Sequence, residues 1–107
     1  MEGIPGGGAV AVLGASPTFL DDQFTDNAVG GNGGAIVFDA SGGGDIINCL
    51  FTLNNGSGGY GGAVANFGSS VAFTNCTFTD NSTDISGGAI FDSSGQPSST
   101  VTNTLSN

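Results

Sequence analysis

The stretch that decides the fold is residues 61–81, GGAVANFGSSVAFTNCTFTDN. It opens with a Gly-Gly turn, continues with short runs of Val, Ala, Phe and Thr, and ends at Asp80-Asn81. Apolar and polar residues alternate with period two, which predicts strands at residues 63–65, 71–74 and 76–79. A loop at 67–70 and a bend at Asn75 join them. Three short strands in about 27 residues are typical of one triangular turn, or rung, of a parallel β-solenoid.

The same pattern returns along the chain at a fixed period. Phe24, Phe51, Phe78 and Leu105 are spaced by 27 residues each, and Gly-Gly-Ala-Val/Ile motifs begin at Gly7, Gly33, Gly61 and Gly87. Such a period indicates a stack of similar units rather than one globular core. We therefore predict an all-β solenoid that forms a single domain over residues 1–107. It should contain about four rungs of 27 residues, with three short strands per rung and uncapped ends.

Residues 27 positions apart should stack in adjacent rungs, about 4.8 Å from one another. The inward columns predicted from this spacing are Phe24, Phe51, Phe78 and Leu105; Phe19, Ile46 and Phe73; and Ile36, Val64 and Ile90. Asparagines form turn columns of their own, which are Asn27, Asn54 and Asn81, and Asn48 and Asn75. A stacked amide donates to one rung and accepts from another, so a structural role explains these residues.

The charge of the chain excludes several classes of partner. It has no Lys, Arg or His, and its nine acidic residues give a net charge of -9. The chain has no basic side chain that could neutralise phosphate groups. We therefore expect it to bind neither nucleic acids nor anionic membrane surfaces. No run of apolar residues approaches the roughly 20 that a membrane span requires, so we expect no membrane insertion.

Acidic residues are the candidates for chemistry. Asp21-Asp22 is the best pair for hydrolysis by two carboxylates, but it occupies the columns of Asn48 and Cys49 and is better explained as a bend. We therefore expect no enzymatic activity and no obligatory cofactor. Calcium is the one metal that these residues suggest, and the candidate ligands are Asp26 and Asp80, which share a column.

Cys49 and Cys76 are also 27 residues apart. Their Cα atoms should lie near 4.8 Å, which is inside the range for a disulfide. Two free cysteines in an inward column are the alternative, and the sequence leaves both open.

The Gly-Gly-Ala-Ile and Phe-x-x-Asn motifs resemble the repeats of polymorphic outer-membrane proteins. The matching residues are Gly33 to Ile36, Gly61 to Val64 and Gly87 to Ile90, together with Phe24 to Asn27, Phe51 to Asn54 and Phe78 to Asn81. The resemblance implies a right-handed parallel β-helix and an extracellular or cell-surface location. It leaves the function open, because this solenoid carries adhesins, enzymes and inert stalks.

Two functions follow as hypotheses. The first is a structural subunit whose uncapped ends stack on copies of itself, head to tail, to form a filament or surface fibre. A second copy placed after the first would continue the spacing, because its Gly7 would follow Leu105 by nine residues, as Gly33 follows Phe24. The alternative is a short segment of an adhesin-like solenoid that binds a receptor or glycan through its loops.

Overall fold

The fold is an all-β stack of short parallel strands. The computed structural model describes residues 8–39, 43–92, 99–102 and 105–106, and in these it contains 15 strands and no helix. Gly7, which begins the first predicted glycine motif, lies outside the described residues. Strands pair with strands of the preceding and following rungs, and every strand pairing is parallel.

Four sheets run along the stack. The first sheet contains β1 (Val10–Leu13), β5 (Ile36–Asp39), β9 (Val64–Phe67) and β13 (Ile90–Asp92). The second contains β2 (Thr18–Leu20), β6 (Gly43–Ile47), β10 (Ser70–Thr74) and β14 (Ser99–Thr102). The third contains β3 (Gln23–Thr25), β7 (Leu50–Thr52), β11 (Thr77–Thr79) and β15 (Leu105–Ser106). The fourth contains β4 (Ala28–Val29), β8 (Asn55–Gly56) and β12 (Ser82–Thr83).

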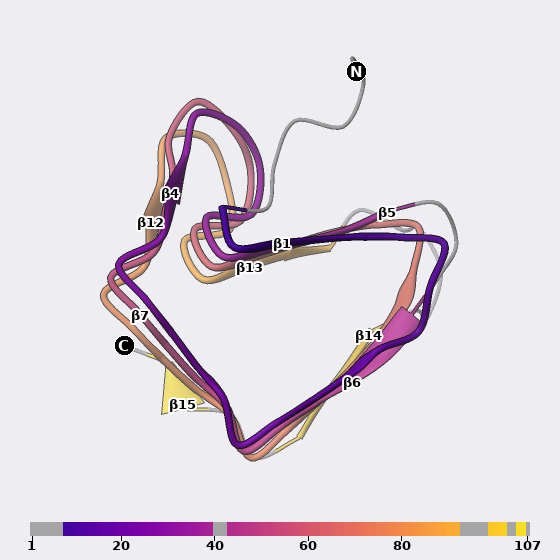
Figure 1. The fold of residues 1–107 in the computed structure, drawn as a ribbon. Helices are drawn as coiled ribbons and strands as arrows, with labels where there is room; N and C mark the ends of the chain where they lie inside the picture. Colours follow the sequence, from indigo (N-terminus) through magenta and orange to yellow (C-terminus); the bar gives the residue numbers. More distant parts are fainter. Residues whose placement is uncertain (1–7, 40–42, 93–98, 103–104, 107) are drawn as a thin grey trace.

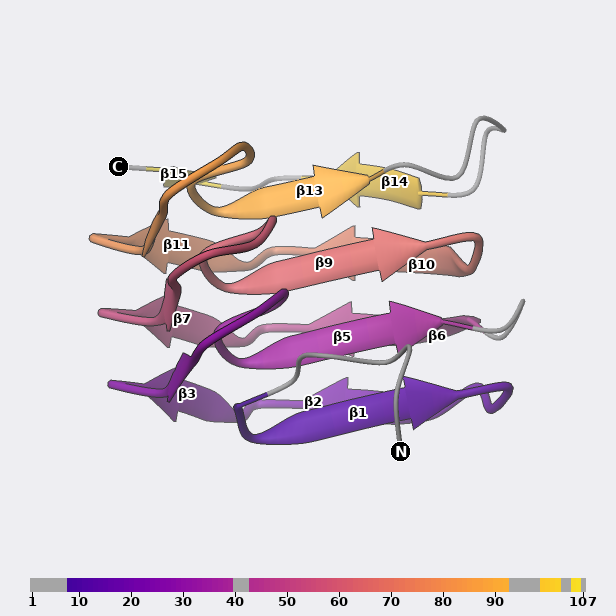
Figure 2. The same cartoon turned by 90° about the horizontal axis from the view of Figure 1, so that it is seen from above.

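The chain winds through these sheets as a right-handed coil. Viewed along the stack, it passes from β1 through the second and third sheets to β4 and returns by a protruding loop to β5 (Figure 1). Viewed from the side, the rungs lie one above another (Figure 2). The predicted parallel β-helix is confirmed. The two-residue strands of the fourth sheet were not predicted, so each of the first three rungs has four short strands rather than three.

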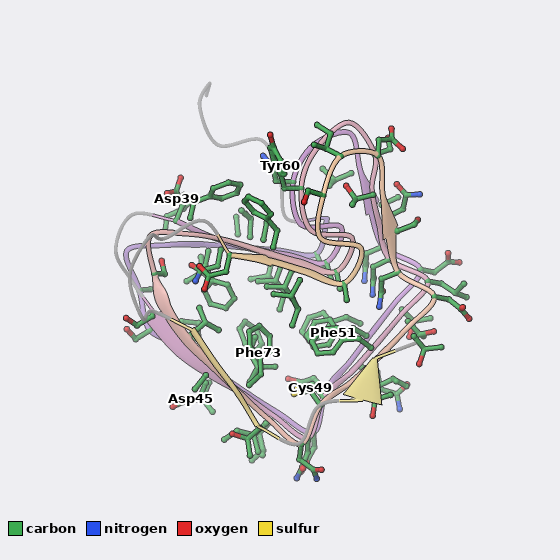
Figure 3. The ribbon with its side chains drawn as sticks, turned by 180° about the vertical axis from the view of Figure 1, so that it is seen from behind. Asp39, Asp45, Cys49, Phe51, Tyr60 and Phe73 are labelled. Carbon is green, nitrogen blue, oxygen red and sulfur yellow. The ribbon has the colours of Figure 1, made fainter. Side chains whose placement is uncertain are left out.

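The interior is filled by the columns that the 27-residue spacing predicts. The rings of Phe24, Phe51 and Phe78 stack with centroids 4.9 and 4.8 Å apart and interplanar angles of 8° and 4°. Phe19 pairs with Ile46, and Ile46 with Phe73, in one parallel register. Ile36 and Val64 are fully buried, and Ile90 is partly buried against the same core. Figure 3 shows Phe51 and Phe73 inside the coil.

The prediction that Leu105 continues the phenylalanine column is wrong. Thr77 pairs with Leu105, and the position opposite Phe78 is held by Ser106, so the last register is 28 residues rather than 27. The cause is the connection from β13 to β14. Ile90 and Ser99 are nine residues apart, whereas their partners Val64 and Val71 are separated by seven. The continuation of the spacing from Leu105 into a second copy is lost with this shift.

Close packing between rungs explains the Gly-Gly motif. A Cβ atom on Gly34 would lie 2.1 Å from the carbonyl oxygen of Gly62 and 2.6 Å from the amide nitrogen of Asn55. A Cβ on Gly62 would lie 2.0 Å from the carbonyl oxygen of Gly88. Only glycine fits where the protruding loop returns to the first sheet.

Candidate functional site

Edge strands lie on the first and last rungs of the described stack. In the described part of the chain, β1, β2, β3 and β4 each have a neighbour on one side only, and so do β12, β13, β14 and β15. A strand of this kind presents unpaired amide and carbonyl groups along its free edge. Another rung with the same spacing can pair with them.

The third sheet shows which backbone groups face the free edge. Leu50 N–H donates to the carbonyl of Asp22, and Asp26 N–H donates to the carbonyl of Thr52. Because successive residues of a strand direct their backbone groups to opposite sides, Gln23 and Thr25 direct theirs away from β7. The edge of β3 therefore offers two donors and two acceptors to a further strand.

The first rung also exposes more of the apolar core than the second rung does. Phe24 retains 8% of its surface, whereas Phe51 above it retains none. Val10 and Phe19 are only partly buried. A further rung below would cover these side chains, just as the first rung covers the equivalent side chains of the second rung.

The asparagine column runs through the stack as a directional hydrogen-bond ladder. Asn27 donates from its backbone N–H and its Nδ2 to Asn54 Oδ1, at 3.1 and 3.0 Å. Asn54 donates in the same way to Asn81 Oδ1, at 3.0 and 2.9 Å. The Nδ2 groups of Asn54 and Asn81 also donate to the carbonyls of Phe24 and Phe51 in the rung below.

The ladder ends in complementary groups. Among the described residues, nothing donates to Asn27 Oδ1, and nothing accepts from the backbone N–H of Asn81. The first member of the ladder therefore keeps an unused acceptor and the last an unused donor, but Asn81 lies in the third rung, and β13, β14 and β15 of the fourth rung lie beyond it. A copy stacked on the fourth rung would hold its Asn27 two rungs, or about 10 Å, from Asn81, so the ladder does not continue directly across such a contact.

The outer asparagine column lies at a sharp corner. Asn48 and Asn75 have φ values of 54° and 56°, and Asp21 occupies the same corner with φ 57°. Asn75 Nδ2 donates to Asn48 Oδ1 at 2.7 Å. Asp and Asn tolerate the left-handed region better than most residues, which explains why they recur there. Asp21 and Asp22 thus lie at a bend, as their column position predicts.

The structure does not bring the calcium candidates together. Asp26 and Asp80 share a second left-handed corner, but Leu53 lies between them in the middle rung. Two rungs separate their Cα atoms by about 10 Å. Within the described residues there is no group of three or more His, Cys, Asp or Glu side chains that could hold a metal ion.

Cys49 and Cys76 are free and buried, so the disulfide alternative is not realised. Each Sγ lies near carbonyls instead of forming a bond with the other cysteine. Cys49 Sγ is 3.3 Å from Ile47 O, and Cys76 Sγ is 3.2 Å from Ile46 O. Burial raises the pKa of the Cys49 thiol above its usual value, which keeps it protonated near neutral pH.

Two features were missed in the sequence. Leu53 adopts φ 58° although it is neither Gly, Asn nor Asp, and the aspartates in its column could have signalled this. Phe91 makes ring contacts with both Tyr60 and Phe67 outside the core. No periodic signal connects Tyr60 to Phe91, because a loop residue and a strand residue 31 positions apart fall in different columns.

Comparison with known proteins agrees with the motifs. A family model of the Chlamydia polymorphic membrane protein repeat matches residues 23–39 and 75–93. No curated protein and no solved structure matches the chain. No helix in the described ranges is long and apolar enough to cross a membrane. The resemblance to polymorphic outer-membrane protein repeats is confirmed for these two segments, and it supports a surface-associated protein in coarse terms.

Proposed function

We propose that this chain is a non-catalytic structural segment of an extracellular or cell-surface solenoid. Its end rungs pair with further rungs of the same kind, and separate copies stack head to tail into a filament. The observation that carries this proposal is the free edge of the first rung, where Gln23 and Thr25 of β3 direct their backbone N–H and C=O groups away from β7. The first three sheets are also open at the fourth rung, so the fourth rung of one copy can pair with the first rung of the next.

The chemistry of the surface fits a durable extracellular role. The chain has no Lys or Arg, so trypsin finds no cleavage site. Continuous parallel ladders also deny other proteases an open backbone, and stacked strands of this kind are kinetically stable. The repeat similarity to outer-membrane proteins supports the same location.

Charge sets the conditions for assembly. Each copy carries -9 and no basic residue, so stacked copies repel one another. Salt screens this repulsion, with a Debye length of about 10 Å at 0.1 M. Assembly should therefore increase as sodium chloride is raised at a fixed protein concentration, and it should not require calcium.

A substitution at the free edge tests the proposal. Thr25 is exposed and directs its N–H away from β7, so Thr25→Pro removes an edge donor without breaking a bond inside the chain. Thr25→Ala is the matched control, because it changes the same side chain and keeps the amide. Sedimentation velocity across a salt series should show higher assemblies for the wild type and Thr25→Ala, and monomers for Thr25→Pro.

Circular dichroism must first show that Thr25→Pro folds, and the sedimentation results then distinguish two outcomes. If Thr25→Pro assembles as the wild type does, stacking through β3 is wrong. If the wild type stays monomeric at every salt concentration, the filament is wrong, and the chain functions only as rungs within a longer solenoid.

A further inference from the structure

A cluster of aromatic rings lies outside the core, on the outward face of the first sheet. We call Tyr60, Phe67 and Phe91 the aromatic patch. The rings of Tyr60 and Phe91 are 4.4 Å apart at 30°, and those of Phe67 and Phe91 are 5.8 Å apart at 49°. Figure 3 shows Tyr60 and Asp39 on the outer side of this sheet. The patch thus combines a loop residue with residues of β9 and β13.

The rings belong to a packed layer on the outward face, because Ala65 and Val37, which share the column of Phe91, are only 0% and 1% exposed. Phe91 lies opposite Ala65 in the rung below, and Phe67 lies opposite Asp39. The first sheet therefore accepts a small residue or a charged residue in the same columns. All three rings are also partly exposed, whereas the core rings of Phe51 and Phe78 are at most 1% exposed. Aromatic rings that remain partly exposed outside the main core are typical of a contact surface.

Asp39 gives the patch its charge. It pairs in register with Phe67, so the two Cα atoms lie about 4.8 Å apart on adjacent strands. The rest of the chain reinforces the negative potential, because it contains no basic residue and carries -9 in total. Aromatic faces beside a carboxylate attract cations, and this potential repels phosphates and acidic glycans.

Arginine fits this arrangement better than lysine. A guanidinium group is planar, so it stacks on an aromatic face while its N–H groups donate to a carboxylate. A lysine ammonium is more strongly hydrated and offers no planar surface. We propose that the aromatic patch and Asp39 together dock an arginine side chain from a basic segment of a partner protein.

Peptide binding tests this directly. A fluorescein-labelled hexa-arginine peptide and a hexa-lysine peptide are titrated with the folded chain, and fluorescence anisotropy is recorded at low protein concentration. The wild type should bind hexa-arginine more tightly than hexa-lysine at the same salt concentration. Equal affinity for the two peptides, or no binding of hexa-arginine, would overturn the proposal.

Two substitutions locate the site. Asp39→Asn should weaken hexa-arginine binding about two- to fivefold more than Asp45→Asn, which removes the same charge from an exposed position on β6. Figure 3 shows Asp45 on a different face of the solenoid from Asp39. Phe67→Leu, which keeps an apolar side chain but removes the ring, should weaken binding about two- to fivefold.

Circular dichroism establishes that each variant is folded before its affinity is compared. If Asp39→Asn and Asp45→Asn lose the same affinity and Phe67→Leu loses none, the peptide binds through net charge alone and the assigned site is wrong. Because the titration uses unassembled chain, this result does not depend on whether copies stack into filaments.

Discussion

Leu53 offers a quantitative test of the backbone geometry. It lies at a corner with φ 58°, in the same column as Asp26 and Asp80, whose φ values are 61° and 56°. A left-handed conformation costs a residue such as leucine roughly 1–2 kcal/mol, and asparagine reduces that cost by hydrogen-bonding locally. Leu53 is also 53% exposed, so its side chain contributes little to the core. Leu53→Asn should therefore stabilise the protein.

The expected magnitude is the difference between two effects. Relief of backbone strain is worth about 1–2 kcal/mol, and loss of the buried part of the leucine side chain costs about 0.5–1 kcal/mol. The net gain in the free energy of unfolding should be about 0.5–1 kcal/mol, which corresponds to a rise in Tm of about 3–6 °C. Thermal unfolding followed by circular dichroism measures it.

Leu20 supplies the matched control. It is 54% exposed but lies in β2, outside the left-handed region. Leu20→Asn loses a similar apolar contact without any relief of strain, so it should be neutral or destabilising. The two variants should differ by about 1–2 kcal/mol. If Leu53→Asn is no more stable than the wild type, or if Leu20→Asn gains as much, the strain assigned to this corner is wrong.

Further predictions concern the core, the ladder and the packing of rungs. Phe51→Ala should lower the free energy of unfolding by about 3–5 kcal/mol in a denaturant titration, because it opens a cavity between two stacked rings. Asn54→Ala should cost about 2–4 kcal/mol in the same titration, because it leaves buried groups in two rungs unpaired. Gly34→Ala should abolish the cooperative melt, whereas Gly30→Ala, which meets nothing within 4 Å, should leave Tm almost unchanged. Cys49 should react slowly with iodoacetamide at pH 8 until the protein is unfolded, because burial shields the thiol and raises its pKa.

Periodicity predicts the interior of this fold better than its exterior. Phe24, Phe51 and Phe78 were predictable because inward side chains must meet the same neighbours in every rung. Asn54 was predictable for the same reason, since its amide is buried and must pair with the rungs on either side. The direction of the ladder was not predictable, because spacing does not say which amide donates.

The positions where the spacing failed lie at insertions and loops. Leu105 keeps its distance from Phe78 in the sequence, but two additional residues between β13 and β14 change the register of the last rung. The contact between Tyr60 and Phe91 depends on the position of the loop that contains Tyr60 relative to the first sheet. The repeat spacing does not specify that position. Residues that recur at the repeat spacing therefore identify the core. Residues that depart from this spacing lie at the candidate binding surface.

The most direct test of the central claim is electron cryo-microscopy of the 107-residue chain assembled at high salt. Continuous head-to-tail stacking predicts filaments with strands perpendicular to the axis, a rung spacing of about 4.8 Å and a rise of roughly 19 Å per four-rung subunit. Single particles at every salt concentration, or filaments in which the fourth rung of one copy does not meet the first rung of the next, would contradict it.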